Sequence, residues 1–362
     1  MPAGGVPSGW RGGRGAFASA GGPLTAELAR LGAEHTTLPL ATKNPWRMRR
    51  NARRLAHLVE AAEVDLLHAR SRAPAWSALW AARRTRRPFI TTFHGTYNRL
   101  PLGLKDWYNA VMTKGDPVIA ISEFIAEHMR EVYHVPPGRI RVIHRGIDVD
   151  RFDPGAVSQE RLIHLARQWR LPDDGQVVML PGRLTRWKGQ TVLLEAVARM
   201  AERHPGLRCL LVGSSQGRTA YRAELEDLAR RLGIEGVVQI VEDCRDLPAA
   251  YMLTDCVVSA STDPEAFGRV AVEGQAMGRP VVATDHGGAR ETVIHGTTGL
   301  LVPPGDAEAL ARAVEAMLTL APSERQTMAA HGREHARTRF SKARMCEQTL
   351  DVYAETLEAW WA

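Results

Sequence analysis

The chain has 362 residues, 44% hydrophobic and 24% charged, as in ordinary globular proteins. Its length exceeds what one hydrophobic core usually covers, and no apolar run reaches the roughly 18 residues of a membrane-spanning helix, so we expect two domains outside the bilayer. The four cysteines lie far apart without CxxC spacing, which argues against a zinc site or a disulfide framework and favours a cytoplasmic location.

The formal charge of +7 is unevenly distributed, since the first 150 residues carry 22 Lys and Arg against 12 Asp and Glu. Much of this excess lies in two helical stretches, Arg47, Arg49, Arg50, Arg53, Arg54 and Arg83, Arg84, Arg86, Arg87. Without interleaved aromatic residues these stretches do not resemble a nucleic-acid-binding segment. Two interpretations stay open: a solvated surface, or a peripheral contact with an anionic membrane, at the inner face of the cytoplasmic membrane.

In the first half, short apolar runs alternate with longer amphipathic stretches. The apolar runs predict buried parallel strands at 64–68, 88–92, 117–121 and 140–143. The amphipathic stretches predict helices at 49–62, 73–84, 104–113 and 123–133. This βαβ repetition predicts an α/β, Rossmann-like domain over residues 1–155, which ends in a linker at 146–154.

A second series follows a polar turn at 172–175. It predicts strands at 176–180, 208–212, 237–241, 256–259 and 280–283, and helices at 190–203, 218–232, 247–253 and 270–277. We therefore expect a second doubly wound domain over residues 156–340, and final helices at 307–318, 323–337 and 342–361. Ligands bind at the carboxyl ends of parallel strands, so two such domains facing across a cleft would place the chemistry in the loops after the strands.

Two carboxylates bracket the start of a predicted helix. Glu265 would lie in the loop after the strand at 256–259, where it can meet a substrate. The backbone amides of Phe267, Gly268 and Arg269 would form a helix N-terminus that binds anions. Glu273, about two turns into the helix, could reach a second part of the same ligand. The alternative is that Glu265 complements the helix dipole and Glu273 is solvated.

A basic loop follows the first strand of the second domain. It contains Arg183, whose guanidinium is a rigid fork of N–H donors, and Lys188, whose ammonium is a point charge. Both groups are suited to holding a diphosphate. Its glycines are too few for a Walker loop or a GxGxxG fingerprint. An exposed basic loop without a ligand is the alternative.

Two further motifs also end predicted strands. His94 follows the strand at 88–92 and could hydrogen-bond a sugar hydroxyl or transfer a proton, although a structural histidine is the alternative. Gly287 and Gly288 would let the backbone approach a ligand closely, or simply form a tight turn.

Together these motifs resemble the family-4 retaining glycosyltransferases, over roughly residues 24 to 355. The resemblance lies in the order and spacing of Gly182-Arg183 with Lys188-Gly189, His94-Gly95, Glu265 with Glu273 around Phe267-Gly268, Gly287-Gly288 before Glu291, and Gly299 with Leu301-Val302 before Pro304. The resemblance implies the GT-B fold, with two Rossmann-like domains and a last helix, 341–362, that crosses back to the first domain.

The resemblance also implies roles for individual residues. Arg183 and Lys188 are similar to the clamp on the donor diphosphate, and Glu265 to the carboxylate beside the transferred sugar. Glu273 is similar to the family's ribose-binding glutamate, and His94 to a first-domain histidine that contacts the sugar.

Backbone groups complete the implied donor site. Amides around Phe267, Gly268 and Arg269 would hold sugar hydroxyls and phosphate, and the segment from Asp243 to Leu247 would meet the nucleobase.

The implied function is retaining transfer of a hexose from a nucleotide-diphosphate sugar to a bacterial cell-envelope acceptor, lipopolysaccharide or lipid-linked. We expect no cofactor and no metal, because no DxD-type carboxylate pair is placed to bind Mg²⁺; Arg183, Lys188 and a helix N-terminus would supply the positive charge. Two alternatives stay open: a nucleotide-sugar epimerase or hydrolase of the same fold, and a non-catalytic protein that binds membranes or nucleic acid.

The N-terminus departs from the family pattern. Members open with an apolar strand, a glycine-rich loop and a helix before the second strand, whereas here residues 16–22 already resemble the end of that second strand. We therefore predict a shortened first domain in which Gly4-Gly5-Val6 is a remnant of the loop. The unfilled strand position would expose a sheet edge and favour aggregation.

Overall fold

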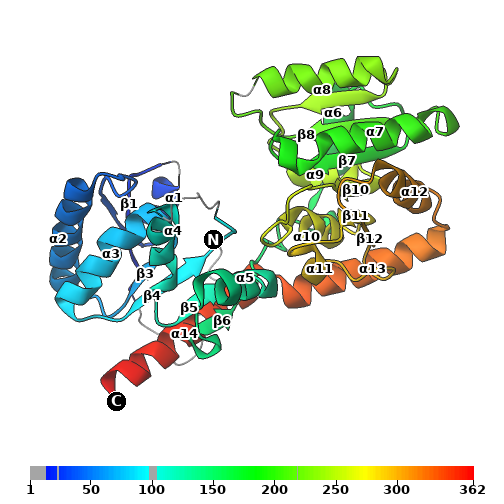
Figure 1. Cartoon of the computed structure of the whole chain (residues 1–362). Coiled ribbons are helices and arrows are strands. Elements are labelled where there is room, and N and C mark those ends of the chain that lie inside the picture. The colour runs from blue at the N-terminus through cyan, green and yellow to red at the C-terminus, as the bar shows by residue number, and fades with distance from the viewer. Residues whose placement is uncertain (1–13, 23, 98–103, 218) are drawn as a thin grey trace. The chain divides into compact units, whose positions relative to one another are not determined.

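The structure is a computed structural model, and it describes residues 14–22, 24–97, 104–217 and 219–362. The chain divides into two compact units (Figure 1). Unit 1 comprises residues up to 144 together with 345–362, and unit 2 comprises residues 145–344. The boundaries thus lie at 144/145 and 344/345. The first is 11 residues before the boundary predicted at 155/156, and the second is four residues after the one predicted at 340/341.

Unit 2 is built on six parallel strands in the order β12-β11-β10-β7-β8-β9. Their bounds are β7 Val177–Pro181, β8 Arg208–Val212, β9 Val238–Val241, β10 Cys256–Ser259, β11 Val281–Thr284 and β12 Leu300–Val302. From β7 the chain adds β8 and β9 on one side and then returns to add β10, β11 and β12 on the other. The direction of winding therefore reverses between β7 and β10, the position where open α/β sheets bind ligands.

Helices surround this sheet. They are α6 Gln159–Gln168, α7 Gln190–Met200, α8 Thr219–Arg231, α9 Leu247–Met252, α10 Arg269–Ala276, α11 Ala289–Thr292, α12 Ala307–Leu318 and α13 Pro322–Arg339. Strands predicted for this unit agree with the structure within about one residue at each end, whereas β12, α6 and α11 were not predicted. All three are short or weakly patterned segments, for which hydrophobic periodicity is a poor signal.

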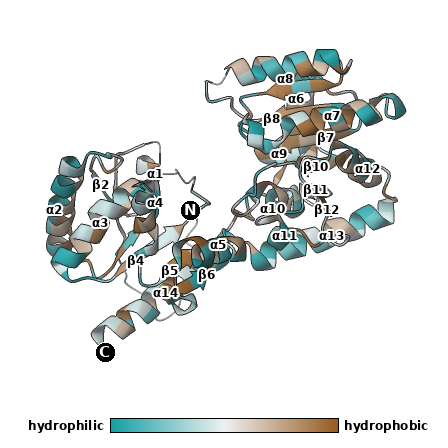
Figure 2. Cartoon of the chain, viewed as in Figure 1, coloured by the Kyte–Doolittle hydropathy of each residue, from teal (hydrophilic) through white to brown (hydrophobic). Residues whose placement is uncertain are grey.

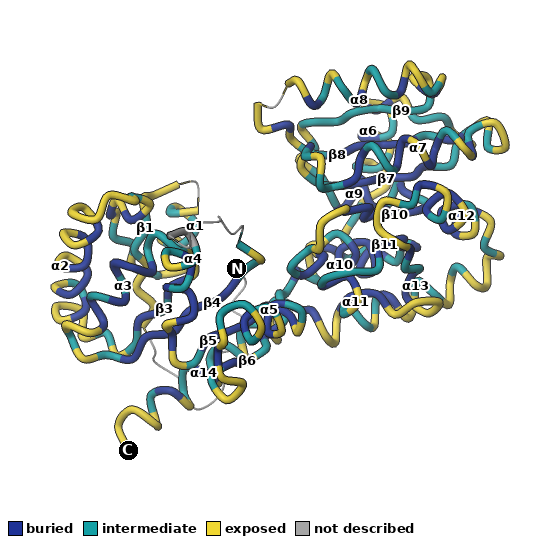
Figure 3. Tube along the Cα trace, viewed as in Figure 1, coloured by how far each residue is buried: buried dark blue, intermediate teal, exposed yellow. Residues whose placement is uncertain are grey.

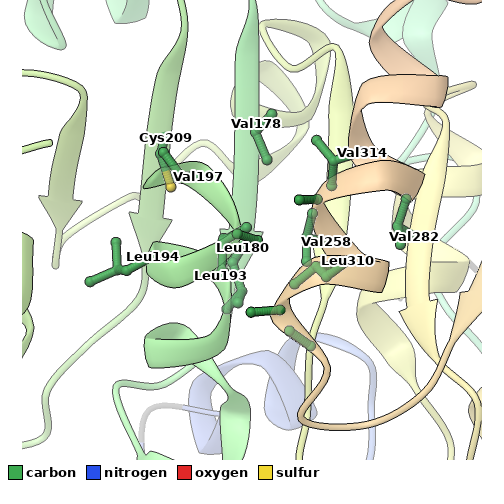
Figure 4. Packing of buried hydrophobic residues seen from close by; sticks show 14 of the residues in the cluster. Val178, Leu180, Leu193, Leu194, Val197, Cys209, Val258, Val282, Leu310 and Val314 are labelled. Carbon is green, nitrogen blue, oxygen red and sulfur yellow. The ribbon is translucent and has the colours of Figure 1, made fainter. Parts of the chain in front are cut away.

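The core of unit 2 lies between the sheet and its helices (Figure 4). Val178 and Leu180 on β7 meet Leu193 and Leu194 of α7 in one fully buried cluster, to which α12 contributes Leu310. All five residues of β7 are buried because helices cover both faces of a parallel sheet. Figure 2 accordingly shows β7 and β8 in brown, while α8 alternates between teal and brown.

Unit 1 contains two parallel sheets. β1 Ala16–Ser19 pairs with β2 Glu34–Thr37, and a second sheet has the order β3-β4-β5-β6, with β3 Leu67–Ala69, β4 Phe89–Phe93, β5 Val118–Ala120 and β6 Ile140–Val142. Among the described strands, β1 pairs only with β2, and β3 only with β4. The predicted remnant Gly4-Gly5-Val6 lies outside the described residues, and the shortened first domain remains a prediction.

The described helices of unit 1 are α1 Thr25–Arg30, α2 Pro45–Ala61, α3 Arg72–Thr85, α4 Leu104–Asn109 with the 3₁₀ turn η1 Ala110–Thr113, and α5 Glu123–Tyr133. All of them except α1 were predicted. Helix α2 begins four residues before the predicted start at 49. Asn44 caps it by accepting hydrogen bonds from the amides of Trp46 and Arg47, and Pro45 occupies the first helical position. Both are start signals that hydrophobic periodicity does not register.

The last helix, α14 Lys342–Trp361, belongs to unit 1 from Met345 onward. Val352 and Tyr353 pack against Ile90 of β4, Ile119 of β5 and Ile143, which directly follows β6. The final turn leaves this core, and Figure 3 shows it in yellow as exposed.

Candidate active site

A buried ion pair occupies the point where the winding of unit 2 reverses. Lys188 ends a 3₁₀ turn after β7, and Glu265 lies in the loop after β10. The Lys188 Nζ atom is 2.6 Å from Glu265 Oε1, and the side chains are only 12% and 11% exposed. Because β7 and β10 are parallel neighbours, the loops that follow them meet at the same edge of the sheet. The structure thus joins two predicted site residues that lie 77 positions apart.

Two serines fix the orientation of the Glu265 carboxylate. The Ser261 hydroxyl lies 2.5 Å from Oε1 and the Ser259 hydroxyl 3.4 Å, so both can donate to the oxygen that Lys188 also contacts. Sequence reasoning missed both serines. The signal was present, since Ser259 ends the strand and Ser261 follows it, four residues before the carboxylate.

The glycine pair after β11 supports the Glu265 loop. The amide of Gly288 donates to the carbonyl of Glu265 at 2.8 Å. Gly287 has φ +55°, and a Cβ atom there would lie 2.5 Å from the Glu265 carbonyl oxygen; one on Gly288 would lie 2.5 Å from the Cα of Phe267. Contacts that short would force the loop to move. The glycines therefore pack against the loop that carries Glu265, while their carbonyls accept from the amides of α11.

The helix after this loop begins as predicted. α10 starts at Arg269, with Gly268 as its N-cap residue at φ +88° and Phe267 buried beside it. The first amides of α10 therefore lie directly after the Glu265 loop, and a helix N-terminus carries a partial positive charge.

Glu273 lies one turn into α10, not two, and it is buried, not solvated. Its side chain is 5% exposed. Arg269 donates to Oε1 from Nε at 3.1 Å and from Nη2 at 2.6 Å, and the Tyr251 hydroxyl donates to Oε2 at 3.0 Å. Residues four apart on a helix lie on the same face, so this spacing pairs Arg269 with Glu273.

The surroundings of Glu273 shift two neighbouring groups. Burial, strengthened by the Glu273 charge, raises the pKa of Tyr251 well above its ordinary value, which keeps the hydroxyl protonated as a donor. Burial disfavours the charge on Arg269, but the Glu273 carboxylate outweighs it and raises the pKa of the guanidinium. The Arg269 side chain is 55% exposed, so one side of this network faces solvent. Tyr251 was not predicted as a site residue.

Arg183 follows β7 in the same loop as Lys188. Its side chain is exposed, and no ion pair joins it to another described residue. Its carbonyl accepts a hydrogen bond from Gln190 Nε2 at 2.9 Å, which ties the loop to the start of α7. Arg183 thus lies, exposed, in the loop that also carries Lys188.

The segment from Asp243 to Leu247 lies on the far side of the sheet, after β9. Asp243 is 78% exposed and lies 3.5 Å from Arg245. Leu247 begins α9, whose N-cap Asp246 accepts hydrogen bonds from Arg161 at 2.6 and 2.8 Å. β8 separates β9 from β7. β9 is therefore about 10 Å across the sheet from β7, the strand that precedes Lys188, at roughly 4.8 Å per strand.

His94 in unit 1 directly follows β4, as predicted, and it is half-buried. Its neighbour His68, on β3, contacts the Tyr353 hydroxyl of α14 at 2.5 Å and the Thr92 hydroxyl at 2.7 Å. Burial, with smaller effects from Arg70 and His94, lowers the pKa of His68 to about 3. His68 is therefore neutral at physiological pH, with both ring nitrogens hydrogen-bonded.

No group of three or more His, Cys, Asp or Glu side chains is arranged to hold a metal ion within the part of the chain that the structure describes. Likewise, none of its described helices is both long and apolar enough to cross a membrane.

Comparison with known proteins relates this geometry to a family. The model described as "Glycosyl transferases group 1" matches residues 164–335, which contain Lys188 and Glu265. The model described as "Glycosyltransferase Family 4" matches residues 16–151, which contain His94. A glycosyltransferase from Rickettsia africae is 35% identical in a match that covers 96% of this chain and 91% of that one, with a TM-score of 0.89. The chain belongs to the GT-B glycosyltransferases of family 4.

Two further proteins are similar to this chain. The chain is 35% identical over 256 residues to "D-inositol 3-phosphate glycosyltransferase" of Saccharomonospora viridis, in a match that covers 69% of this chain and 58% of that protein. The chain thus spans little more than half the length of this curated relative. It is 26% identical to the Anabaena protein HepE solved with UDP and glucose, with a TM-score of 0.80 and coverage of 94% and 91%. The predicted α/β GT-B fold class is confirmed.

Proposed function

We propose that the chain is a retaining hexosyltransferase that moves a sugar from a nucleotide-diphosphate donor to a bacterial cell-envelope acceptor. The observation that carries this proposal is the ion pair of Lys188 and Glu265 at the edge of the sheet, with the exposed Arg183 in the same loop as Lys188. One carboxylate and two cations are what the separation of a sugar cation from a diphosphate anion requires.

The donor would lie along the carboxyl edge of the unit 2 sheet. Arg183, Lys188 and the first amides of α10 would hold the diphosphate, since all three carry positive charge. Lys188 has three N–H donors, so it can bind a phosphate oxygen while it keeps its contact with Glu265. Glu273 would accept from the ribose, and the backbone from Asp243 to Leu247, farther along the edge, would meet the base.

The base and the acceptor follow from the relatives as proposals. The complex of HepE with UDP and glucose supports a uridine diphosphate sugar as the first donor to test. The name of the Saccharomonospora protein supports a hydroxylated acceptor that carries phosphate. In the cell envelope, the acceptor that we propose is lipopolysaccharide or a lipid-linked molecule.

In the proposed reaction the bond between the anomeric carbon and the diphosphate oxygen breaks, and the diphosphate leaves with both electrons. Glu265 stabilises the positive charge that develops on the sugar, while Arg183 and Lys188 stabilise the leaving anion. The acceptor hydroxyl attacks the same face, and its proton passes to the departing phosphate oxygen. His94 would bind a sugar hydroxyl. We propose that no metal takes part, because these side chains supply the charge.

We also propose a peripheral contact with an anionic membrane at the inner face of the cytoplasmic membrane. The arginine excess of the first 150 residues supports it.

The Glu265→Gln variant tests the proposal. It keeps the shape of the side chain but removes its charge, so transfer from UDP, GDP or ADP sugars should fall by about 10²- to 10³-fold, as when one preorganised group is lost. Asp263→Asn is the matched control, because Asp263 is an exposed carboxylate of the same loop. A Glu265→Gln enzyme as active as Asp263→Asn would refute the assignment.

The same assay separates the alternatives. A transferase releases nucleotide slowly until acceptor is added, whereas a hydrolase releases it at full rate without acceptor and an epimerase converts the donor itself. NMR of the product reports the anomeric configuration. Inversion would exclude the retaining reaction.

A further inference from the structure

Unit 1 has a groove of about 810 Å³ at the amino ends of its strands. Phe89 begins β4 and Pro117 precedes β5, and both line the groove together with the end of α3 and the last turns of α14. His94 follows β4 at the opposite end, about 16 Å away for a strand of five residues at roughly 3.3 Å each. The groove is therefore distinct from the edge of the sheet that carries His94.

Five basic side chains line this groove: Arg83, Arg86, Arg87, Lys114 and Arg141. The two acidic residues that line it are already paired. Glu355 lies 3.5 Å from Arg141, and Asp116 lies 3.3 Å from Arg139.

Three of the five cations remain without a carboxylate. Arg87 has Asp65 at 3.7 Å, whereas Arg83, Arg86 and Lys114 form no ion pair with any residue in the described ranges. All three are exposed. The groove thus carries a local excess of positive charge that an anion from outside the chain would neutralise.

The same groove has an apolar and aromatic rim. Leu79 and Phe89 line its interior, and Trp360 lines its edge with 49% of its surface exposed. Trp361 is 64% exposed, and Arg87 lies 5.5 Å from its ring centre. Paired exposed tryptophans beside cations are unfavourable in water but favourable at a membrane interface, where the indole ring is partly apolar and its N–H finds a partner.

We propose that this groove binds the phosphate headgroup of an anionic phospholipid and holds unit 1 on a membrane surface. The charge selects the phosphate, and the tryptophan rim favours a lipid over a free phosphate ion. The inference rests on the proposed membrane contact and assigns it a site, one that leaves the His94 edge of the sheet available. It does not depend on which sugar is transferred.

Two triple variants of the full chain test the site. The groove variant carries Arg83→Glu, Arg86→Glu and Lys114→Glu. The control carries Arg84→Glu, Arg50→Glu and Arg53→Glu, three exposed arginines that do not line the groove. Both variants change the net charge equally, and all six side chains are exposed, so both should unfold at the same temperature as the parent chain.

Binding is measured by sedimentation with vesicles of phosphatidylglycerol and phosphatidylcholine, and with phosphatidylcholine alone. The parent chain should bind only the anionic vesicles, and less at high salt. The groove variant should bind at least about tenfold more weakly and the control within about threefold, because charges near the surface act locally. Equal weakening of both variants, or parent-like binding by the groove variant, would overturn the groove assignment.

Two further outcomes are decisive. Replacing chloride by inorganic phosphate at equal ionic strength should not release the bound chain, and release would assign the groove to a free phosphate. If the parent chain binds no anionic vesicles, both the groove and the membrane contact are wrong, whereas the transfer assay with Glu265→Gln still decides the reaction.

Discussion

The two units treat their buried polar residues differently. Unit 2 buries the charged pair Lys188 and Glu265 where two loops meet, while unit 1 buries His68 in a neutral form between Tyr353 and Thr92. A buried charge is tolerated only beside its partner, so the unit 2 pair depends on both members. A neutral histidine depends instead on pH. The Lys188–Glu265 contact of unit 2 therefore depends on two charges, whereas the His68 contacts of unit 1 depend on neutral hydrogen bonds.

Lys188→Ala should give the largest effect, because it acts on both stability and rate. It leaves Glu265 buried without its cation, and breaking such a pair costs about 3 to 5 kcal/mol of unfolding free energy. The variant also loses the proposed contact with the diphosphate. Chemical unfolding should show the loss of stability and the transfer assay the loss of rate. Wild-type stability would mean that Glu265 is solvated, contrary to its exposure of 11%.

Arg183→Ala tests the difference between an exposed cation and the buried Lys188 of the same loop. Arg183 is exposed and unpaired among the residues described, so its removal should leave the melting temperature unchanged. Transfer should nevertheless slow by about 2 to 4 kcal/mol of transition-state free energy, as for one preorganised donor. Arg186→Ala, which removes the next exposed arginine of the loop, serves as the comparison. If Arg183→Ala transfers at the wild-type rate, the diphosphate is held elsewhere.

His68 predicts acid sensitivity in unit 1. Its pKa falls from 6.5 to about 3 on folding, so the unfolded chain binds the extra proton between these values. Above pH 6.5 His68 is neutral in both states and does not affect the free energy of unfolding. As the pH falls from 6.5 toward 3, protonation of the unfolded chain lowers that free energy by up to about 1.4 kcal/mol per pH unit.

The measurement is the unfolding free energy at pH 7 and pH 5 for the wild type, His68→Gln and His57→Gln. His68→Gln cannot titrate and should lose this part of the pH dependence. His57 is exposed on α2, so its variant should keep it. Equal slopes for all three proteins would place the acid-sensitive group elsewhere.

The smallest expected effect concerns metal ions. Transfer should be unchanged within about twofold by EDTA, because in the proposed reaction Arg183, Lys188 and the start of α10 supply the charge that Mg²⁺ supplies in other transferases. The assay compares initial rates with and without chelator. A loss of activity that Mg²⁺ restores would contradict the metal-free reaction.

The sequence by itself determined the local structure of this protein. Hydrophobic periodicity located β8 and α5 to the residue, because which face of a strand or helix is buried depends on neighbours in the chain. The order of motifs also placed Arg183, Glu265 and His94 in loops after strands, where the structure has them.

The tertiary structure alone decided which of these residues meet. The contact of Lys188 with Glu265, the serines that orient the carboxylate and the partners of Glu273 depend on strand order, which no local pattern specifies. The sequence left Glu273 open as a solvated residue, since periodicity cannot show what covers a helix. The groove of unit 1 likewise joins α3 to α14, far apart in the chain. Sequence patterns report short-range burial, whereas a site is made by long-range packing.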